Sequence, residues 1–212
     1  MSQGAGAIED LRREIDAIDT ALHDLLIRRS EIAAEIGALK ADAAGARPNG
    51  RAAAFMRPGR EAVILRRLVE RHRGPLPWGT IVRIWRELMS AALRVQGPFA
   101  VAVCEPDGAA GGYWDLTRDH FGAHTPTTAH ATAEEVLRAV AEGRAGAGVL
   151  PVPRTGEPRP WWPRLADADA ATPRVCARLP FGTPGVTRGG PVEALVVARV
   201  PPEAPGEDRS LV

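Results

Sequence analysis

The sequence predicts a multidomain protein, an all-helical part followed by a small α/β layer domain. Residues 1 to about 97 are rich in Leu, Ile, Arg, Glu and Ala, with apolar residues at helical spacing. From Gly97 onward Gly, Pro and Val become frequent, and short apolar runs alternate with amphipathic ones, as in strands that alternate with helices. We therefore expect a helical part over residues 1–97 and an α/β part over residues 98–212.

A helix from about Ile8 to Ala41 dominates the helical part. Its apolar residues lie alternately four and three positions apart, which indicates a long helix that packs along a seam against other helices. They are Leu11, Ile15, Ile18, Leu22, Leu25, Ile32, Ile36 and Leu39. Residues 1–7 are small and polar, and we expect them to be disordered.

One position of this seam is charged. The spacing demands a further seam residue in the middle of the helix, and that residue is Arg29. The nearby acids Glu31 and Glu35 lie off the seam and are poorly placed to pair with it. A lone buried charge costs several kcal/mol, so the guanidinium needs an anion from elsewhere. Lys40 lies eleven residues further on, within about 20° of Arg29 on the same helix face. Two cations that face one helical interior predict either a small dianionic ligand or an acid from a facing helix.

Two shorter helices complete the helical part. One begins at Pro58, a residue suited to the first helical turn, and runs to about Arg73. The other spans about Trp78–Gln96, and residues 42–53 form a connection expected to be mobile. One long and two short helices cannot bury the long seam within one protomer, so we expect a two-fold dimer in which the long helices lie against each other.

The α/β part is expected to alternate strands and helices. The expected strands cover residues 99–104, 124–130, 146–152, 174–179 and 193–200, and the expected helices cover 113–121, 133–142 and 160–166. The final run EDRSLV resembles the start of another strand, which suggests that the sequence is part of a longer chain.

Composition argues against several classes of function. The formal net charge of +1 gives no general attraction to nucleic acid or to a membrane surface. No apolar run approaches the roughly 18 residues of a membrane span, and the acidic start at Glu9 and Asp10 is unlike a signal peptide. Cys104 and Cys176 lie in apolar runs and are expected to be buried, reduced thiols, which favours a cytoplasmic location.

Five motifs follow one another along the helical part. They are L-R-x-x-I-D-x-I-D, L-L-x-R-R, G-x-x-K, R-x-x-R-E and A-x-x-x-Q. Over about residues 8–97 they resemble the all-helical (AroQ-class) chorismate mutases. The resemblance implies an intertwined homodimer of three-helix protomers that binds chorismate among its helices. It also implies conversion of chorismate to prephenate for phenylalanine and tyrosine synthesis, without a cofactor.

The resemblance assigns roles to matching residues. Arg12 resembles the arginine donated across the dimer to a substrate carboxylate, and Arg29 resembles the carboxylate-binding arginine of the same protomer. Lys40 resembles the lysine that contacts the ether oxygen and a carboxylate. Gln96 resembles the neutral donor to the ether oxygen. Lys40, Gln96 and Arg29 are therefore the expected catalytic residues.

The start of the second helix matches the family at one pair of residues and departs from it at one position, and the third helix contains a second departure. Arg60 and Glu61 match an Arg-Glu pair whose glutamate receives the substrate hydroxyl. Arg57 stands where enteric members have an aspartate, and Ala92 stands where they have a serine that helps to hold a carboxylate. The connection between Lys40 and Arg60 is also longer. These departures imply weaker or differently shaped ground-state binding, while the groups aimed at the breaking bond remain.

The chemistry itself requires little of the protein. The reaction is an intramolecular pericyclic shift, so it needs no nucleophile, metal or redox cofactor. A protein accelerates it by holding the compact, chair-like conformer and by placing charge where the ether oxygen becomes negative. Arginines suit planar carboxylates, and a lysine suits a point of developing charge. Because Gln96 donates without titrating, we expect activity to persist as the pH rises through neutrality.

The α/β part shows a weaker resemblance. The run from Ala133 to Val152 resembles a helix–Gly–strand unit of prephenate dehydratases. The Gly-rich loop and the Thr-Arg-Phe catalytic run of that family are missing, and Leu116-Thr117-Arg118 lies in a helical pattern. We therefore expect a degenerate, non-catalytic dehydratase-like domain used for ligand sensing or docking.

Two groups of residues in the α/β part invite a binding interpretation. His120, His124 and His130 lie close in sequence, but only the first two have a helical ligand spacing, so structural or surface roles are favoured over a metal site. Four aromatic residues could line a pocket for a ring-bearing ligand, although core packing is favoured. These are Tyr113, Trp114, Trp161 and Trp162.

Other interpretations stay open. An isochorismate-pyruvate lyase uses the same scaffold and nearly the same cationic pocket. In a third interpretation the helical part is a non-catalytic dimerisation module and the α/β part binds an amino acid or a partner enzyme. Arg57, Ala92 and the long connection keep this interpretation open. Arg29 would then be a structural residue paired with Glu61 or another acid, and Arg12 a surface residue.

Overall fold

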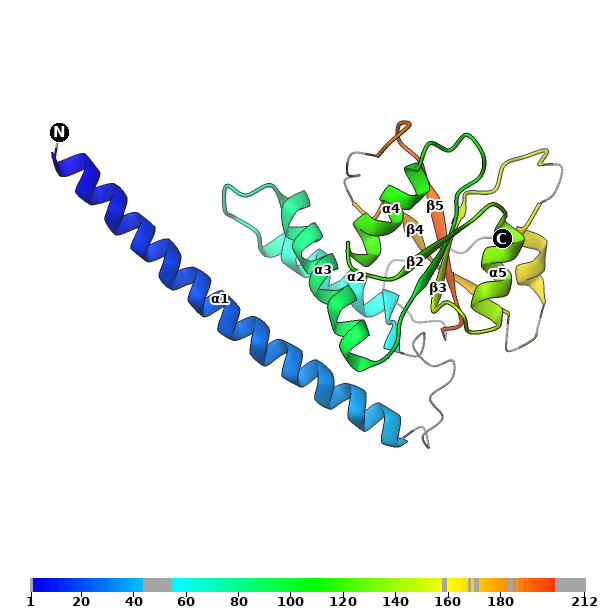
Figure 1. Cartoon of the computed structure of the whole chain (residues 1–212), viewed down its shortest axis with the longest axis horizontal. Helices are drawn as coiled ribbons and strands as arrows, with labels where there is room; N and C mark the ends of the chain where they lie inside the picture. Colours follow the sequence, from blue (N-terminus) through cyan, green and yellow to red (C-terminus); the bar gives the residue numbers. More distant parts are fainter. Residues whose placement is uncertain are drawn as a thin grey trace.

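A computed structural model describes residues 2–43, 55–157, 160–167, 169, 172–182, 185 and 187–200. Most of the connection expected to be mobile, and the final EDRSLV run, lie outside these residues. Within the described ranges, helices come first and a mixed sheet with covering helices follows, so the predicted succession of a helical part and an α/β layer part is confirmed (Figure 1).

The helical part contains α1 (Ser2–Ala43), α2 (Pro58–Arg71) and α3 (Trp78–Gln96). The predicted bounds of α3 are confirmed, because Pro77 and Gly97–Pro98 punctuate the sequence at both ends. The expectation of disorder at the N-terminus is wrong for residues 2–7, which belong to α1. Ala and Gly there bring no proline or capping residue that would stop the helix.

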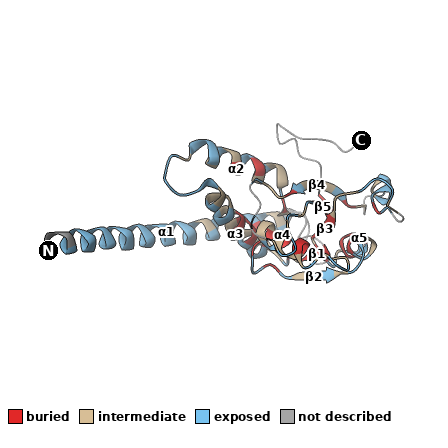
Figure 2. Ribbon diagram, turned by 90° about the horizontal axis from the view of Figure 1, so that it is seen from above, coloured by how far each residue is buried: buried red, intermediate tan, exposed pale blue. Residues whose placement is uncertain are grey.

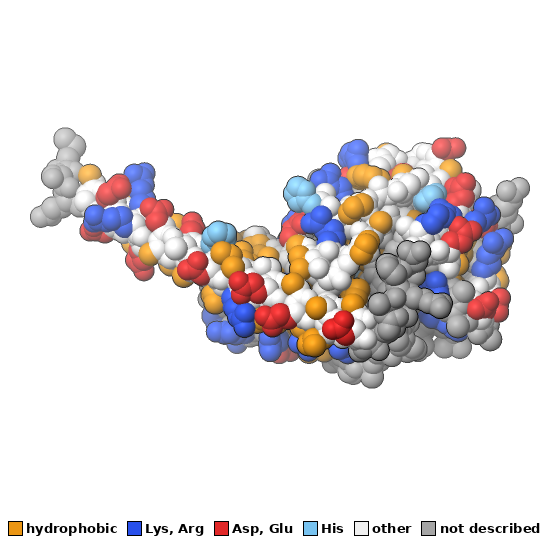
Figure 3. Space-filling view, turned by 60° about the horizontal axis from the view of Figure 1, so that its bottom comes forward, with side chains coloured by type: hydrophobic (Ala, Val, Ile, Leu, Met, Phe, Trp, Pro, Cys, Tyr) orange, Lys and Arg blue, Asp and Glu red, His pale blue; other side chains and the backbone are white. Residues whose placement is uncertain are grey.

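The seam of α1 is exposed in the single chain. Its large apolar side chains range from Ile32 at 41% exposed to Leu39 at 69% exposed. Among the described side chains of α1, only Ala33 and Gly37 are buried. The helix projects from the rest of the molecule as a rod whose C-terminal half lies against α3 (Figures 1 and 2). Apolar side chains are visible between charged ones along the rod (Figure 3).

The α/β part is built on a five-stranded sheet of order β2-β1-β3-β5-β4. The strands are β1 (Val101–Cys104), β2 (Thr127–His130), β3 (Ala147–Pro151), β4 (Arg174–Leu179) and β5 (Ala194–Ala198). The first three strands are parallel, whereas β5 runs antiparallel to both β3 and β4. The expected helices are present as α4 (Gly112–Phe121), α5 (Ala133–Ala141) and a short 3-10 helix, η2 (Trp162–Ala166).

The helices α4 and α5 cover opposite faces of the sheet. Along β1, Val101 and Val103 face the α4 side and Ala102 and Cys104 face the α5 side, as strand alternation requires. Gly148 of β3 lies directly under α5, where a Cβ atom would be 2.6 Å from a methyl group of Val136. The close packing of α5 on the sheet therefore depends on this glycine.

Core packing is confirmed for Tyr113, Trp114 and Trp161, whereas Trp162 is 49% exposed. Tyr113 belongs to the cluster on the α4 side, and Trp161 belongs to the cluster on the α5 side. The pairs at 113–114 and 161–162 therefore do not line one common pocket. Cys104 is buried and Cys176 is half-buried, and the two thiols are not joined. None of the helices in the described ranges combines the length and apolarity that a bilayer span requires.

The core of the α/β part continues into the helical part. Met56, next to the start of α2, and Leu93 of α3 lie in the same buried cluster as Val103 and Phe121. Phe55 packs against this cluster as well. The sequence changes from helices to a sheet at Gly97. The two parts nevertheless share one buried cluster, which contains residues from both sides of Gly97.

Candidate active site

Arg29 lies where α1 meets α3. Its Nη1 atom donates a hydrogen bond of 3.2 Å to the backbone carbonyl oxygen of Leu88, and the side chain is half-buried. Burial lowers the pKa of Arg29 from its usual value. Within the described part of the chain, no acid forms an ion pair with it, because Glu31 and Glu35 both pair with Arg28. The seam therefore holds a partly desolvated cation for which the described residues supply no counter-charge.

Gln96 lies further along the same contact between α1 and α3, and Lys40 lies nearby on α1. The two helices approach closely where Gly37 faces Gln96, since a Cβ atom on Gly37 would be 3.0 Å from the Cα atom of Gln96. The Nε2 atom of Gln96 donates to the backbone carbonyl one turn earlier, at 3.1 Å. The ammonium of Lys40 lies 5.3 Å from the centroid of the Phe55 ring. The structure thus places Arg29 and Gln96 along one helix–helix contact, and Lys40 lies three residues beyond Gly37 on α1.

Glu61 is held by an arginine that the sequence did not single out. The Nη1 atom of Arg86 donates to Oε2 of Glu61 at 2.7 Å, and the two side chains are 6% and 16% exposed. Burial lowers the pKa of Arg86, and the charge and hydrogen bond of Glu61 oppose this shift. Arg86 interrupts the apolar face of α3 that carries Met89 and Leu93. An arginine at a position where helical spacing calls for an apolar residue is the signal that predicted Arg29. The same signal could have identified Arg86.

The remaining predicted residues lie elsewhere on α1 and α2, except Ala92, whose carbonyl accepts the hydrogen bond from Gln96. Arg12 is exposed near the N-terminal end of α1, where it pairs with Glu9 at 3.3 Å. Arg60 and Arg57 are exposed at the start of α2, and Ala92 is half-buried on α3. A single chain therefore places Arg29 and Gln96 on the contact between α1 and α3, holds Glu61 in a separate ion pair with Arg86, and leaves Arg12 near the opposite end of α1.

Comparison with known proteins finds a family match for the helical part. Residues 11–97 match the chorismate mutase type II family. This match confirms the resemblance seen in the motifs. No solved structure matches the chain.

Full-length relatives extend the comparison. The bifunctional chorismate mutase/prephenate dehydratase of Pseudomonas aeruginosa is 34% identical over 150 residues, which are 71% of this chain and 40% of that protein. The proteins of the same name from Stutzerimonas stutzeri and Neisseria gonorrhoeae are each 33% identical, over 72% and 69% of this chain. This chain thus spans about 40% of the length of these relatives. An alignment of 150 residues must also extend beyond the chorismate mutase type II match into the α/β part, which supports the dehydratase-like resemblance there.

In the dehydratase-like part, a carboxylate of the chain itself occupies the N-terminus of α4. Glu105 follows β1 and accepts hydrogen bonds from the backbone N–H groups of Gly111 at 3.0 Å and Trp114 at 2.8 Å. Backbone N–H groups at such a helix end otherwise bind anions well. Because Glu105 already accepts from these N–H groups, they are not available to an anionic substrate. This agrees with the absence of the Gly-rich loop from the sequence.

The three histidines of the dehydratase-like part do not converge. The ring of His120 packs edge-on against Phe121, and its pKa is lowered well below the usual value by burial and by Arg86. His124 is exposed, and its carbonyl accepts from Arg94. His130 lies 4.0 Å from Glu135. The described residues contain no group of three His, Cys, Asp or Glu side chains suited to a metal ion.

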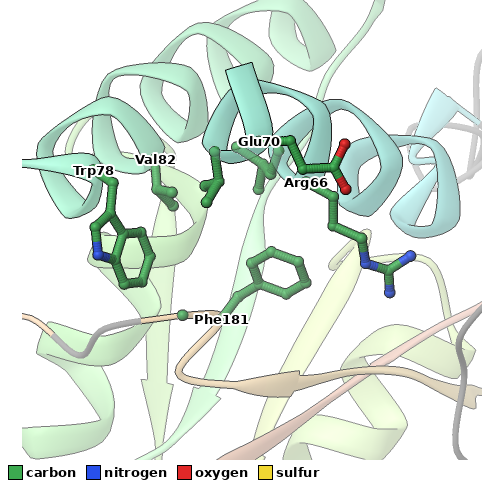
Figure 4. A pocket seen from close by; sticks show the side chains of 8 residues that line it. Arg66, Glu70, Trp78, Val82 and Phe181 are labelled. Atoms are coloured by element: carbon green, nitrogen blue, oxygen red, sulfur yellow. The ribbon is translucent and has the colours of Figure 1, made fainter. Parts of the chain in front are cut away.

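A separate hollow of about 230 Å³ lies between the chorismate mutase-like helices and the α/β part (Figure 4). It is lined mainly by apolar groups from α2, α3 and the segment after β4. The lining residues are Leu65, Arg66, Val69, Glu70, Trp78, Val82, Phe181 and Gly182. None of the predicted site residues lines it, so it is distinct from the contact that carries Arg29 and Gln96.

Proposed function

We propose that this protein is a chorismate mutase, which converts chorismate to prephenate for aromatic amino-acid synthesis. The observation that carries the proposal is the half-buried guanidinium of Arg29, which has a backbone carbonyl and no acid as its partner among the described residues. The match of residues 11–97 to the chorismate mutase type II family supports it. Chorismate is a small dianion, so it would supply the countercharge that this cation lacks.

The proposed mechanism relies on positioning and charge. Arg29 would exchange the carbonyl of Leu88 for a substrate carboxylate, since a charge-assisted hydrogen bond is stronger than one to a neutral carbonyl. Lys40 would contact the ether oxygen and a carboxylate, and Gln96 would turn its amide from the helix backbone to the same ether oxygen. Both donors then face the atom that gains negative charge as the bond breaks.

Glu61 and Arg60 would complete the substrate contacts from α2. By the family resemblance, Glu61, which pairs with Arg86 in the single chain, would receive the substrate hydroxyl. Arg60, exposed in the single chain, would approach the substrate from the same first turn of α2. Because the expected aspartate and serine are replaced by Arg57 and Ala92, ground-state binding would be weaker than in members that carry them.

We further propose a homodimer in which Arg12 enters the partner's site. The exposed apolar seam of α1 supports this, because isolated proteins rarely leave so long an apolar stripe in water. Arg12 lies in the N-terminal part of α1, seventeen residues before Arg29, and a second copy of the chain could bring it near a site. The unpaired thiols of Cys104 and Cys176 are consistent with the cytoplasm as the place of the reaction.

The deciding experiment follows chorismate disappearance with the wild type and Arg29→Ala. Loss of this arginine should lower kcat/KM by roughly two orders of magnitude or more, equivalent to about 3 kcal/mol of transition-state stabilisation. Arg28→Ala is a matched control, because Arg28 is its neighbour on α1 but is exposed and paired with Glu31. The control should retain the wild-type rate. If Arg29→Ala also retained it, Arg29 would not bind the substrate.

Two substrates separate the alternatives. Turnover of isochorismate in preference to chorismate would identify a lyase on the same scaffold, and turnover of neither would favour a sensing or dimerisation role. Incubation with prephenate tests the α/β part. We expect no phenylpyruvate above the acid-catalysed background, since Glu105 already occupies the N–H groups at the start of α4.

A further inference from the structure

The sequence holds a single lysine. Of its 27 lysine and arginine residues, only Lys40 is a lysine, and every other one is an arginine. The two side chains are not interchangeable, because a guanidinium presents a planar fork whereas an ammonium is a compact charge with three donors. In so arginine-rich a sequence, the ammonium at position 40 indicates a need for a compact charge at this point of α1.

The ammonium of Lys40 lies over an aromatic ring. Its Nζ atom is 5.3 Å from the centroid of the Phe55 ring, within the roughly 6 Å over which the face of a ring attracts a cation. A single ring can cover only one side of an ammonium, so N–H donors remain for a ligand. This contact therefore restricts where the long side chain of Lys40 places its charge, and leaves that charge able to bind.

The same ring lies against the C-terminal end of α3. A Cβ atom on Gly97 would be 3.2 Å from the Cε2 atom of Phe55, so the ring packs close to the backbone directly after Gln96. Phe55 thus contacts Lys40 of α1 and approaches α3 beside Gln96. One ring therefore lies beside both residues that the proposed mechanism directs at the ether oxygen.

Buried residues of the α/β part hold Phe55 in place. Its ring packs against the cluster that contains Met56, Leu93, Val103 and Phe121. Val103 belongs to β1 and Phe121 to α4, so this cluster includes the sheet and a helix that covers it. A side chain packed against such a core has little freedom to move. The ring is therefore a rigid support, whereas a lysine side chain on its own is flexible.

We propose that Phe55 is a positioning residue of the mutase site, which holds the ammonium of Lys40 beside Gln96. The inference rests on the proposed function, in which both of these residues contact the ether oxygen. Phe55 acts through Lys40, since its ring holds the cation and carries no group that could donate to the ether oxygen itself. The α/β part thereby contributes to the mutase reaction by supporting this ring, without catalysing a step of its own.

The single lysine allows a direct test of the contact. When the full chain is produced with ¹³C-labelled lysine, the only lysine signals in its NMR spectrum come from Lys40. The face of an aromatic ring shifts nearby protons upfield, so the Cε protons of Lys40 should resonate upfield of those of free lysine. Phe55→Leu should remove this shift, and Phe55→Tyr, which keeps the ring, should retain it. This measurement does not depend on activity.

Enzyme assays and thermal unfolding then test the positioning role. Phe55→Leu should lower kcat/KM for chorismate by about threefold to tenfold, a factor that a cation–π contact of ordinary strength accounts for. Phe55→Tyr should recover the wild-type value, since tyrosine also presents a ring face to the ammonium. Phe121→Leu is the matched control, because it removes a ring from the same cluster but on α4, where the ring packs beside His120. It should lower the thermal stability without moving the Lys40 signal or kcat/KM.

Three results would overturn the inference while leaving the mutase proposal intact. They are a Lys40 signal at the position of free lysine in the wild type, an unchanged kcat/KM in Phe55→Leu, and an equal loss in Phe55→Leu and Phe121→Leu. The wild-type signal keeps the test decisive if Phe55→Leu folds poorly. A wild-type protein that does not consume chorismate would refute the proposed function, and the positioning role with it, whatever the Lys40 signal shows. The wild-type rate therefore separates the two failures.

Discussion

Arg29 and Arg86 are both arginines in apolar surroundings, and their partners differ. Arg86 has an internal carboxylate, that of Glu61. Arg29 has a backbone carbonyl, so a carboxylate brought by a ligand can displace its partner at little cost. The break in the α1 seam predicted Arg29. The partner of Arg86 could not be predicted, because α2, α3 and the Phe181 segment meet only in the folded chain.

At the residue scale, Gln96→Glu tests the donor to the ether oxygen. A glutamate donates only when protonated, so kcat/KM should fall as the pH rises through the pKa of the new carboxyl group, whereas the wild type should stay active through neutrality. At high pH the loss should be about a hundredfold or more, because a carboxylate would repel the developing charge. The measurement is a pH profile of kcat/KM for both proteins. Parallel profiles would remove Gln96 from the site.

At the scale of elements, the sequence predicted helices better than strands. Proline and glycine punctuation defines α3, while strand ends depend on partners distant in sequence. The expected run 193–200 is paired only over Ala194–Ala198, because β3 opposite it extends from Ala147 to Pro151. The expected start at Ile8 was too late for α1, since the alanines and glutamine before it favour helix and no proline interrupts them.

The crossing of α1 and α3 offers a test at this scale. Gly37→Val would place branched methyl groups against the backbone of Gln96, where even a Cβ atom would be at 3.0 Å. The helices must then separate, which should lower kcat/KM by about tenfold or more and destabilise the fold by about 1–3 kcal/mol. Enzyme assays and thermal unfolding measure both effects.

Gly6→Ala is the control for this substitution. Gly6 lies on the same helix, and a Cβ atom there would meet nothing within 4 Å, so alanine should leave activity unchanged and slightly favour the helix. Wild-type activity in Gly37→Val would show that the close crossing is not needed for the site.

At the scale of the whole molecule, the change of composition at Gly97 marks the change from helices to a sheet, but it does not mark a boundary between separate hydrophobic cores. Met56 and Leu93 show that the α/β core includes residues of the helical part, and composition carries no information about such contacts. The sequence also predicted that the α1 seam packs against a second helix, and most of this seam is exposed in the single chain. The seam of α1 needs a second helix, and its exposed residues in the structure show how much apolar surface that partner would cover.

Mixing two inactive variants tests whether the site is shared between protomers. In a homodimer of Arg12→Ala or of Arg29→Ala, each site lacks one arginine, so both proteins should be nearly inactive. In the mixed dimer, one site combines Arg29 of one protomer with Arg12 of its partner, and the other site lacks both. Because half of the dimers are mixed after random exchange, co-refolding should restore about a quarter of the wild-type activity. If each site drew both arginines from one chain, or if the protein were a monomer, mixing would restore nothing.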